Sequence, residues 1–312
     1  MHMDPRQQKR IEELVAAIRR LGPQLDKMSE AFREGFNSEH PPDFDKWSDQ
    51  DWCRNAFGNA LVRLRQLTEQ NFQFIETMGL LAVARYVFEL SVWLHLFKTD
   101  SRFGLVYYRQ LLDTQLRYYR DTAEHLRREV ELLKSFEQKD HQSTDAILKN
   151  TTSKEGLISE IGTFIRQAMD AVDAEASRRF SVFLDDAKTN GYGFQAYRVE
   201  KKAIPQAEQA IRQIEQEIAE FQRCVPQEVK DLAPGRWEWR KMAEKVELTT
   251  EYDYIYCYAS KLLHATPASL TTDHKNLELR EVYIFLRYIY SKLLEVMDLA
   301  QQRPECQIKI KA

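Results

Sequence analysis

The stretch EYDYIYCYASKLLHATP, residues 251–267, decides whether this chain contains a strand or only helices. Its tyrosines fall at every second position, which is the spacing of a strand with one aromatic face: Tyr252, Tyr254, Tyr256 and Tyr258. The stretch also carries a polar ladder at intervals of four, which only a helix stacks on one side: Tyr252, Tyr256, Ser260 and His264. We interpret it as a helix that ends before Pro267, because the rest of the chain is helical in pattern.

The composition favours helices throughout. The 312 residues include only ten glycines and nine prolines, and 43% of them are hydrophobic. The abundant Glu, Gln, Lys, Arg, Leu and Ala lose little side-chain freedom in a helix. A net charge of −3 gives no general attraction to nucleic acid or to an acidic membrane. The four cysteines have neither CxxC nor metal-ligand spacing, so we interpret them as reduced thiols of a cytosolic protein.

The most regular helical pattern lies between Ile204 and Val225, where apolar residues alternate steps of three and four without interruption. Three such heptads predict a coiled-coil-like helix. Its simplest partner is the predicted helix at 155–188, so that the two form an antiparallel hairpin. We expect this hairpin to be inserted in a helical bundle, with the chain divided into residues 1–140, 141–226 and 227–312.

Breaks between the other helices follow from local signals. The first helix is expected to break near Gly22 and Pro23. Ser48 or Asp49 is positioned to cap a helix that begins at about residue 49. Residues 139–156 are polar and predict a loop with a short helical turn.

The most apolar segment, residues 79–97, carries Arg85, Glu89 and His95, and therefore predicts a buried central helix rather than a membrane span. A charge in such a helix is costly unless it is paired. Arg85 and Glu89 therefore either bond to each other or face a polar pocket. His264 either bonds to a nearby backbone carbonyl or tyrosine hydroxyl, or completes a site with these two residues.

Two segments carry a family resemblance: ARYVFELSVWL (84–94), and WRKMAEKV with YDYIYCYASKLLHATP (239–246 and 252–267). They resemble an uncharacterised family of bacterial all-helical domains with a central Arg-x3-Glu helix and a late Tyr-x3-Ser-x3-His motif. That family is distantly similar to the HEPN group, which includes ribonuclease toxins and phage-defence proteins. The resemblance implies a site with Arg85, Glu89 and His264 as candidate catalytic residues and with Tyr256 and Ser260 as substrate contacts, without assigning a reaction.

Ribonucleases of the HEPN group carry an Arg-x4-6-His motif, and RDTAEH, from Arg120 to His125, fits it. In such a site the histidine moves a proton at the ribose 2′-OH or the leaving oxygen, and the arginine stabilises the phosphate, without a metal. The resemblance also implies a homodimer that brings two motifs to one cleft. REGFNSEH, from Arg33 to His40, fits the loose form as well. The alternative for RDTAEH is the solvated face of a charged helix.

The stretch LVYYRQLLDTQLRYYR, residues 105–120, combines tyrosines with arginines. Arg117 and Tyr119 are candidate substrate-binding residues, because arginine binds phosphate and tyrosine stacks on bases. The alternative is an aromatic edge of the core that is covered by arginine side chains.

The sequence thus predicts an all-α protein, a helical bundle with an inserted long antiparallel, coiled-coil-like hairpin. Zinc-protease, P-loop and serine-hydrolase motifs are absent, and no cofactor is expected. Two functions remain open. The first is a cytoplasmic bacterial effector of phage defence or a toxin–antitoxin system, which cuts RNA as a homodimer. The second is a non-catalytic module whose hairpin binds a protein partner or a second copy. Neither function involves a membrane.

Overall fold

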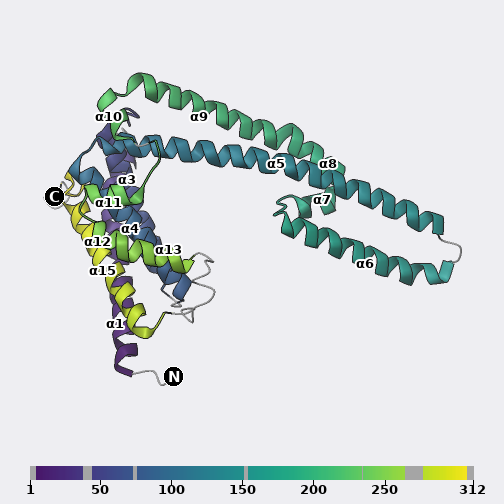
Figure 1. Cartoon of the computed structure of the whole chain (residues 1–312), viewed down its shortest axis with the longest axis horizontal. Helices are drawn as coiled ribbons and strands as arrows, with labels where there is room; N and C mark the ends of the chain where they lie inside the picture. The colour runs from purple at the N-terminus through teal and green to yellow at the C-terminus, as the bar shows by residue number, and fades with distance from the viewer. Residues whose placement is uncertain are drawn as a thin grey trace. The chain divides into compact units, whose positions relative to one another are not determined.

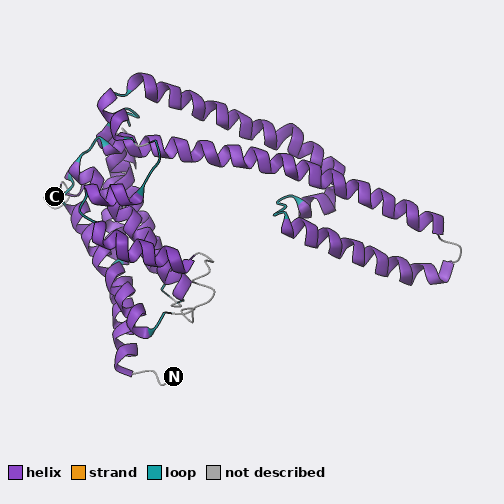
Figure 2. Ribbon diagram, viewed as in Figure 1, coloured by secondary structure: helices purple, strands orange, loops and turns teal. Residues whose placement is uncertain are grey.

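The computed structural model describes residues 5–37, 44–72, 76–150, 154–233, 235–263 and 277–307 (Figure 1). Within these ranges the secondary structure is helical and no strand occurs (Figure 2). The all-α prediction is therefore confirmed. The tyrosine stretch is helical too, since Tyr252–Tyr256 forms a π-helical segment, η2, that continues into α13 (Cys257–Leu263).

The chain divides into two compact units. Unit 1 contains Met1–Tyr108 and Cys224–Ala312, and unit 2 contains Arg109–Arg223. The first division lies earlier than the predicted boundary at residue 140, and one long helix, α5 (Phe103–Asn150), runs through residues 139–150 of the predicted loop. That polar stretch contains neither glycine nor proline before residue 150, so nothing in it ends the helix.

Unit 1 is built around α4 (Thr77–Thr99), which packs against helices from both ends of the chain. The remaining helices that lie wholly in unit 1, apart from η2 and α13, are α1 (Pro5–Arg20), α2 (Gly22–Asn37), α3 (Asp49–Gln70), α10 (Gln227–Leu232), α11 (Trp239–Lys245), α12 (Thr249–Glu251), α15 (Leu279–Gln301) and α16 (Pro304–Gln307). The partners of α4 are α3, α11, η2, α13 and α15. In the described part of the chain α4 alone is long and apolar enough to cross a membrane, and 61% of its apolar window is buried inside the protein. This burial confirms the predicted central helix.

Two predicted helix ends in unit 1 are confirmed. The chain breaks at Leu21 between α1 and α2, beside Gly22 and Pro23. The hydroxyl of Ser48 caps α3 by accepting a hydrogen bond from the backbone N–H of Asp51 at 3.2 Å.

In unit 2 the long helix α5 carries the apolar face on which shorter elements pack. These are α6 (Lys154–Arg178), α7 (Leu184–Asn190), α8 (Tyr192–Arg198), the π-helical segment η1 (Val199–Ala203) and α9 (Ile204–Cys224). Their core contains small and branched side chains and one phenylalanine: Ala123, Leu126, Val130, Leu132, Leu133, Phe136, Ala176, Ala187, Ala196, Val199 and Ala207. Alanine is frequent in this core, which allows the helices to approach closely.

Ion pairs align α9 with α5 in antiparallel order. They join Arg120 to Glu215 at 2.7 Å, Arg127 to Glu208 at 2.9 Å and Lys134 to Glu200 at 3.1 Å. The basic residues of these pairs are seven positions apart along α5. Their acidic partners are seven positions apart from Glu215 to Glu208, but eight apart from Glu208 to Glu200, because the π-helical turn of η1 holds one extra residue. The predicted coiled-coil-like helix is present, and the partner in these ion pairs is α5 rather than the predicted helix at 155–188.

Candidate functional site

Three of the predicted site residues meet between α4 and η2. Arg85 donates a hydrogen bond from Nε to Glu89 Oε1 at 3.0 Å and another from Nη2 to the Tyr256 hydroxyl at 3.1 Å. The guanidinium carbon also lies 4.6 Å from the centroid of the Tyr256 ring. Burial raises the pKa of Glu89 although Arg85 opposes that shift. Arg85 and Glu89 therefore do satisfy each other, and Tyr256 joins them.

The rest of the polar ladder is only partly described. Tyr252 stacks on Tyr256, with ring centroids 4.9 Å apart, so the four-residue spacing does bring these side chains together. The Ser260 hydroxyl is buried and has no hydrogen-bond partner among the residues that the structure describes. His264 lies outside the described residues. The catalytic role expected for Arg85, Glu89 and His264 therefore stays a prediction.

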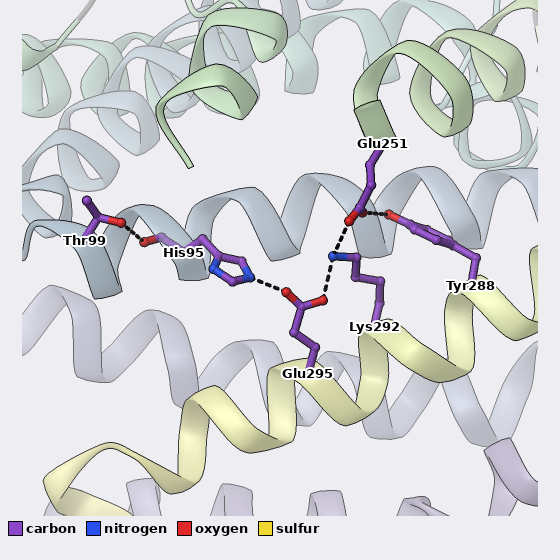
Figure 3. Close-up of polar contacts among 6 residues, drawn as sticks. All are labelled: His95, Thr99, Glu251, Tyr288, Lys292 and Glu295. Atoms are coloured by element: carbon purple, nitrogen blue, oxygen red, sulfur yellow. Dashed lines mark hydrogen bonds and ion pairs between the residues drawn. The ribbon is translucent and has the colours of Figure 1, made fainter. Parts of the chain in front are cut away.

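A second polar cluster joins α4, α12 and α15, and the sequence analysis missed it (Figure 3). Lys292 is buried and donates to two carboxylates, Glu295 Oε2 at 2.6 Å and Glu251 Oε1 at 2.9 Å. His95 Nε2 lies 2.5 Å from the other oxygen of Glu295. The Tyr288 hydroxyl donates to Glu251 Oε2 at 2.9 Å. We call these five residues the Lys292 network.

Charge balance holds this network together. Burial alone would raise the pKa of Glu295, but hydrogen bonds from His95 and Lys292 lower it to about 2, so the carboxylate is ionised at neutral pH. Burial and the neighbouring Glu251 raise the pKa of Tyr288, which keeps its phenol protonated as a donor. One ammonium thus binds two carboxylates, which is the geometry that makes a buried lysine tolerable.

A sequence signal for this network exists in α15. Its buried residues follow helical steps of three and four, and Lys292 occupies one of these apolar positions, between Ile289 and Val296. A lysine in a buried stripe requires an anion nearby. Glu295 follows three residues later on the same helix, but Glu251 could not be predicted as the second anion, since it comes from another part of unit 1.

The predicted Arg120–His125 motif is divided between two surroundings in unit 2. Arg120 is exposed and pairs with Glu215 on α9. His125 is partly buried, its ring centroid lies 6.3 Å from that of Phe180, and its Nε2 has no hydrogen-bond partner in the described part of the chain. The structure records no contact between the two side chains of the motif in these residues. The role of the motif stays a prediction.

The stretch at residues 105–120, which was predicted to bind a substrate, is buried in one part and accessible in another. Tyr108 is buried and stacks on Trp52 with ring centroids 4.3 Å apart, so this part of the stretch is a core edge. Further along α5, Arg117 is exposed, and Tyr119 is partly buried beside the exposed Tyr118. Arg117 and Tyr119 are thus accessible for a ligand.

The end of α6 displays a phenylalanine in an unusual backbone conformation. Phe180 has φ +56°, and its side chain is 76% exposed. Two hydrogen bonds close the helix around it, from Phe180 N to Ser177 O at 3.2 Å and from Ser181 N to Ala176 O at 2.9 Å. This is a Schellman motif, in which glycine ordinarily takes the left-handed position.

Buried Glu129 of α5 fixes this turn. The Ser181 hydroxyl donates to Glu129 Oε1 at 2.5 Å, and the Phe183 N–H donates to the same oxygen at 3.2 Å. Glu129 is only 2% exposed, so these bonds satisfy a carboxylate that would otherwise be costly. The turn that carries Phe180 is therefore held in one conformation.

Comparison of the chain with protein-family models, with curated proteins and with solved structures finds no match. Among the described residues no group of three or more His, Cys, Asp and Glu side chains is arranged to hold a metal ion.

Proposed function

We propose that the chain is a helical protein-interaction module that associates with a second copy of itself through unit 2. The observation that carries this proposal is the exposed ring of Phe180 on a turn held by Glu129. A left-handed phenylalanine costs about 1 kcal/mol relative to glycine. A ring that is 76% exposed gains little from burial in the monomer to offset that cost. Strain of this kind is typical of a binding residue.

Other apolar side chains accompany Phe180. Val182, Phe194 and Tyr197, which belong to the connection from α6 through α8, are all exposed. We call these four residues the turn surface. Phe180 and Val182 also line a groove of about 440 Å³. Aromatic residues presented by a rigid turn supply large contact area at low entropic cost, which is what the centre of an interface requires.

Charges of both signs flank the turn surface and favour a second copy as its partner. Arg178 and Arg179 precede Phe180, and Asp185 and Asp186 follow it at the start of α7. A two-fold axis through the turn surface would set the basic pair of one copy against the acidic pair of the other. Acidic residues slightly outnumber basic ones across 109–223, so this unit offers no general attraction to RNA.

Sedimentation equilibrium over a range of protein concentrations tests the proposal. We expect the wild type to form a dimer, and the Phe180→Ser and Val182→Ser variants to be monomers at the same concentrations. Met78→Ser is the matched control, because Met78 is an exposed apolar residue of unit 1. A wild type that stays monomeric at every concentration, or a Phe180→Ser variant that dimerises normally, would refute the proposal.

The RNA-cutting effector is a second candidate function, in the cytoplasm and in phage defence or a toxin–antitoxin system. One contact favours it: His125 lies against Phe180, so association through the turn surface would bring the His125 side chains of two copies to one interface. Arg120 would then have to leave Glu215 to bind a phosphate. The thiols of the four cysteines, none of which forms a disulfide, suit a reducing compartment.

Induced expression followed by electrophoresis of total RNA tests this second function. A ribonuclease would slow growth and fragment RNA, and His125→Ala and Arg120→Ala would both abolish the fragmentation at unchanged protein level. His141→Ala is the control, because His141 is an exposed histidine of the same helix. Intact RNA in the wild type, with purified dimer also inactive on RNA, would leave the interaction module as the function.

A further inference from the structure

A cavity of about 560 Å³ in unit 1 lies beside the Lys292 network, between α12–η2 and α15. The size falls within the usual range of small-molecule sites. Its walls include groups that the network does not use. Arg287 and Ser291 are exposed on α15 and line the cavity, and Tyr254 and Ile284 contribute apolar surface that is exposed to solvent.

The cavity carries charges of both signs. On one wall Arg287 has no carboxylate partner in the described part of the chain, and the contact recorded for its guanidinium is with the Tyr283 ring. On the other wall the Glu251 side chain is 30% exposed, although Lys292 and Tyr288 already bond to its carboxylate. A simple anion would meet Arg287 but be repelled by Glu251 and Glu295. A simple cation would be attracted by the carboxylates but repelled by Arg287 and Lys292.

We infer that this cavity binds a free α-amino acid with an apolar side chain. Such a ligand presents one anionic and one cationic group, one for each of the two walls. Its carboxylate binds Arg287, with the Ser291 hydroxyl as a further donor, because a guanidinium pairs with a carboxylate through two parallel hydrogen bonds. Its ammonium binds the exposed part of Glu251. Its apolar side chain lies against Tyr254 and Ile284.

The site leaves the network intact on binding. Each Glu251 oxygen has lone pairs beyond the one that accepts from Lys292 or Tyr288. The ligand ammonium therefore adds a donor without displacing either bond. Added positive charge also offsets the excess of carboxylate over ammonium in the Lys292 network. Selectivity for an amino acid over its derivatives follows, because each charged end has its own partner.

Isothermal titration calorimetry of the full chain with each of the standard amino acids tests the inference. At least one apolar amino acid should bind saturably, and its N-acetyl and amide derivatives, which each lack one charge, should bind at least about tenfold more weakly. Arg287→Gln should weaken binding by a similar factor, and Tyr254→Ala should weaken it too. Arg280→Gln is the control, because Arg280 is exposed on α15 but does not line the cavity.

Three results would overturn the inference. They are the absence of binding by every standard amino acid, equal binding of both derivatives, and unchanged binding by Arg287→Gln. Because Arg287 and Tyr254 are exposed, their variants should fold normally, which circular dichroism verifies. The dimer proposed above involves unit 2, so neither experiment decides the other.

Discussion

Arg85 and Tyr256 are joined by two interactions at once, although 171 positions separate them in the sequence. The guanidinium donates a hydrogen bond to the phenol oxygen at 3.1 Å, and its carbon lies 4.6 Å from the centroid of the ring. A planar cation can meet both the hydroxyl and the face of one tyrosine, which a lysine ammonium does less well. The hydrogen bond and the ring contact together therefore fix both the position and the orientation of η2 against α4.

Removing the Tyr256 hydroxyl measures the polar part of this link. We expect Tyr256→Phe to lower the free energy of unfolding by about 1 kcal/mol, because Arg85 loses one hydrogen bond while the ring contacts with Arg85 and Tyr252 remain. Urea denaturation measures the change. Tyr254→Phe is the control, since Tyr254 is exposed and stacks on Tyr258. Equal effects of the two substitutions would contradict the assigned bond.

Lys292 is expected to be the most sensitive position of its network. Lys292→Met should destabilise unit 1 by about 2–4 kcal/mol, because it leaves Glu251 and Glu295 close together without the ammonium between them. The double variant Lys292→Met with Glu251→Gln should recover part of that loss, since one of the two charges is removed. Thermal and urea unfolding of the three proteins measure both effects. No recovery in the double variant would show that the carboxylates are not the cause.

The stability of the protein should depend on acid pH through Glu295. The folded pKa of this carboxyl, about 2, is lower than its ordinary value of 4.5, so its contribution is complete above pH 4.5 and is lost as pH falls toward 2. The difference in unfolding free energy between wild type and Glu295→Gln should therefore shrink over that interval. Urea unfolding at a series of pH values checks this. A difference that stays constant from pH 5 to 2.5 would argue against the lowered pKa.

A glycine substitution at Phe180 separates the role of the ring in self-association from the cost of its backbone conformation to folding. Phe180→Gly should leave the free energy of unfolding of the monomer unchanged or raise it by up to about 1 kcal/mol, because glycine adopts φ +56° without strain. The same variant should lose self-association. Unfolding at a concentration below the dimer range, together with sedimentation, distinguishes the two effects. A strong loss of monomer stability would mean that the ring supports the fold.

The helices of this chain could be predicted from apolar periodicity, and the places where prediction failed have physical causes. A loop with a short helical turn was expected at 139–156 because the stretch is polar, yet its residues up to Asn150 contain no glycine or proline and simply continue α5. The coiled-coil-like pattern of 204–225 correctly predicted a packed helix. It could not identify α5 as the partner, because a single apolar stripe carries no information about the helix it meets.

The candidate sites show the same limit. Arg85, Glu89 and Tyr256 were grouped by spacing and chemistry, and they do meet in unit 1. Arg120 and His125 were grouped because they fit a short motif of the HEPN group, but a separation of five residues turns their side chains to different sides of α5, one toward Glu215 and one toward Phe180. The left-handed backbone conformation of Phe180 could not be predicted, since nothing in the sequence Ser-Arg-Arg-Phe-Ser indicates a residue with positive φ.

The π-helical segment at Tyr252–Tyr256 determines which changes of length the chain tolerates at this point. A π turn holds one residue more than an α turn, and such segments arise when a single residue is added to a helix. Deleting the exposed Asp253 would let the helix continue in α geometry, and the residues beyond it would keep nearly the same direction, because the π turn accommodates the extra residue within one turn. Glu251 bonds to α15 and Tyr256 bonds to α4 on either side of that deletion. A chain one residue shorter here would therefore keep both attachments, whereas the same deletion within regular α-helix would rotate the residues beyond it by about 100°.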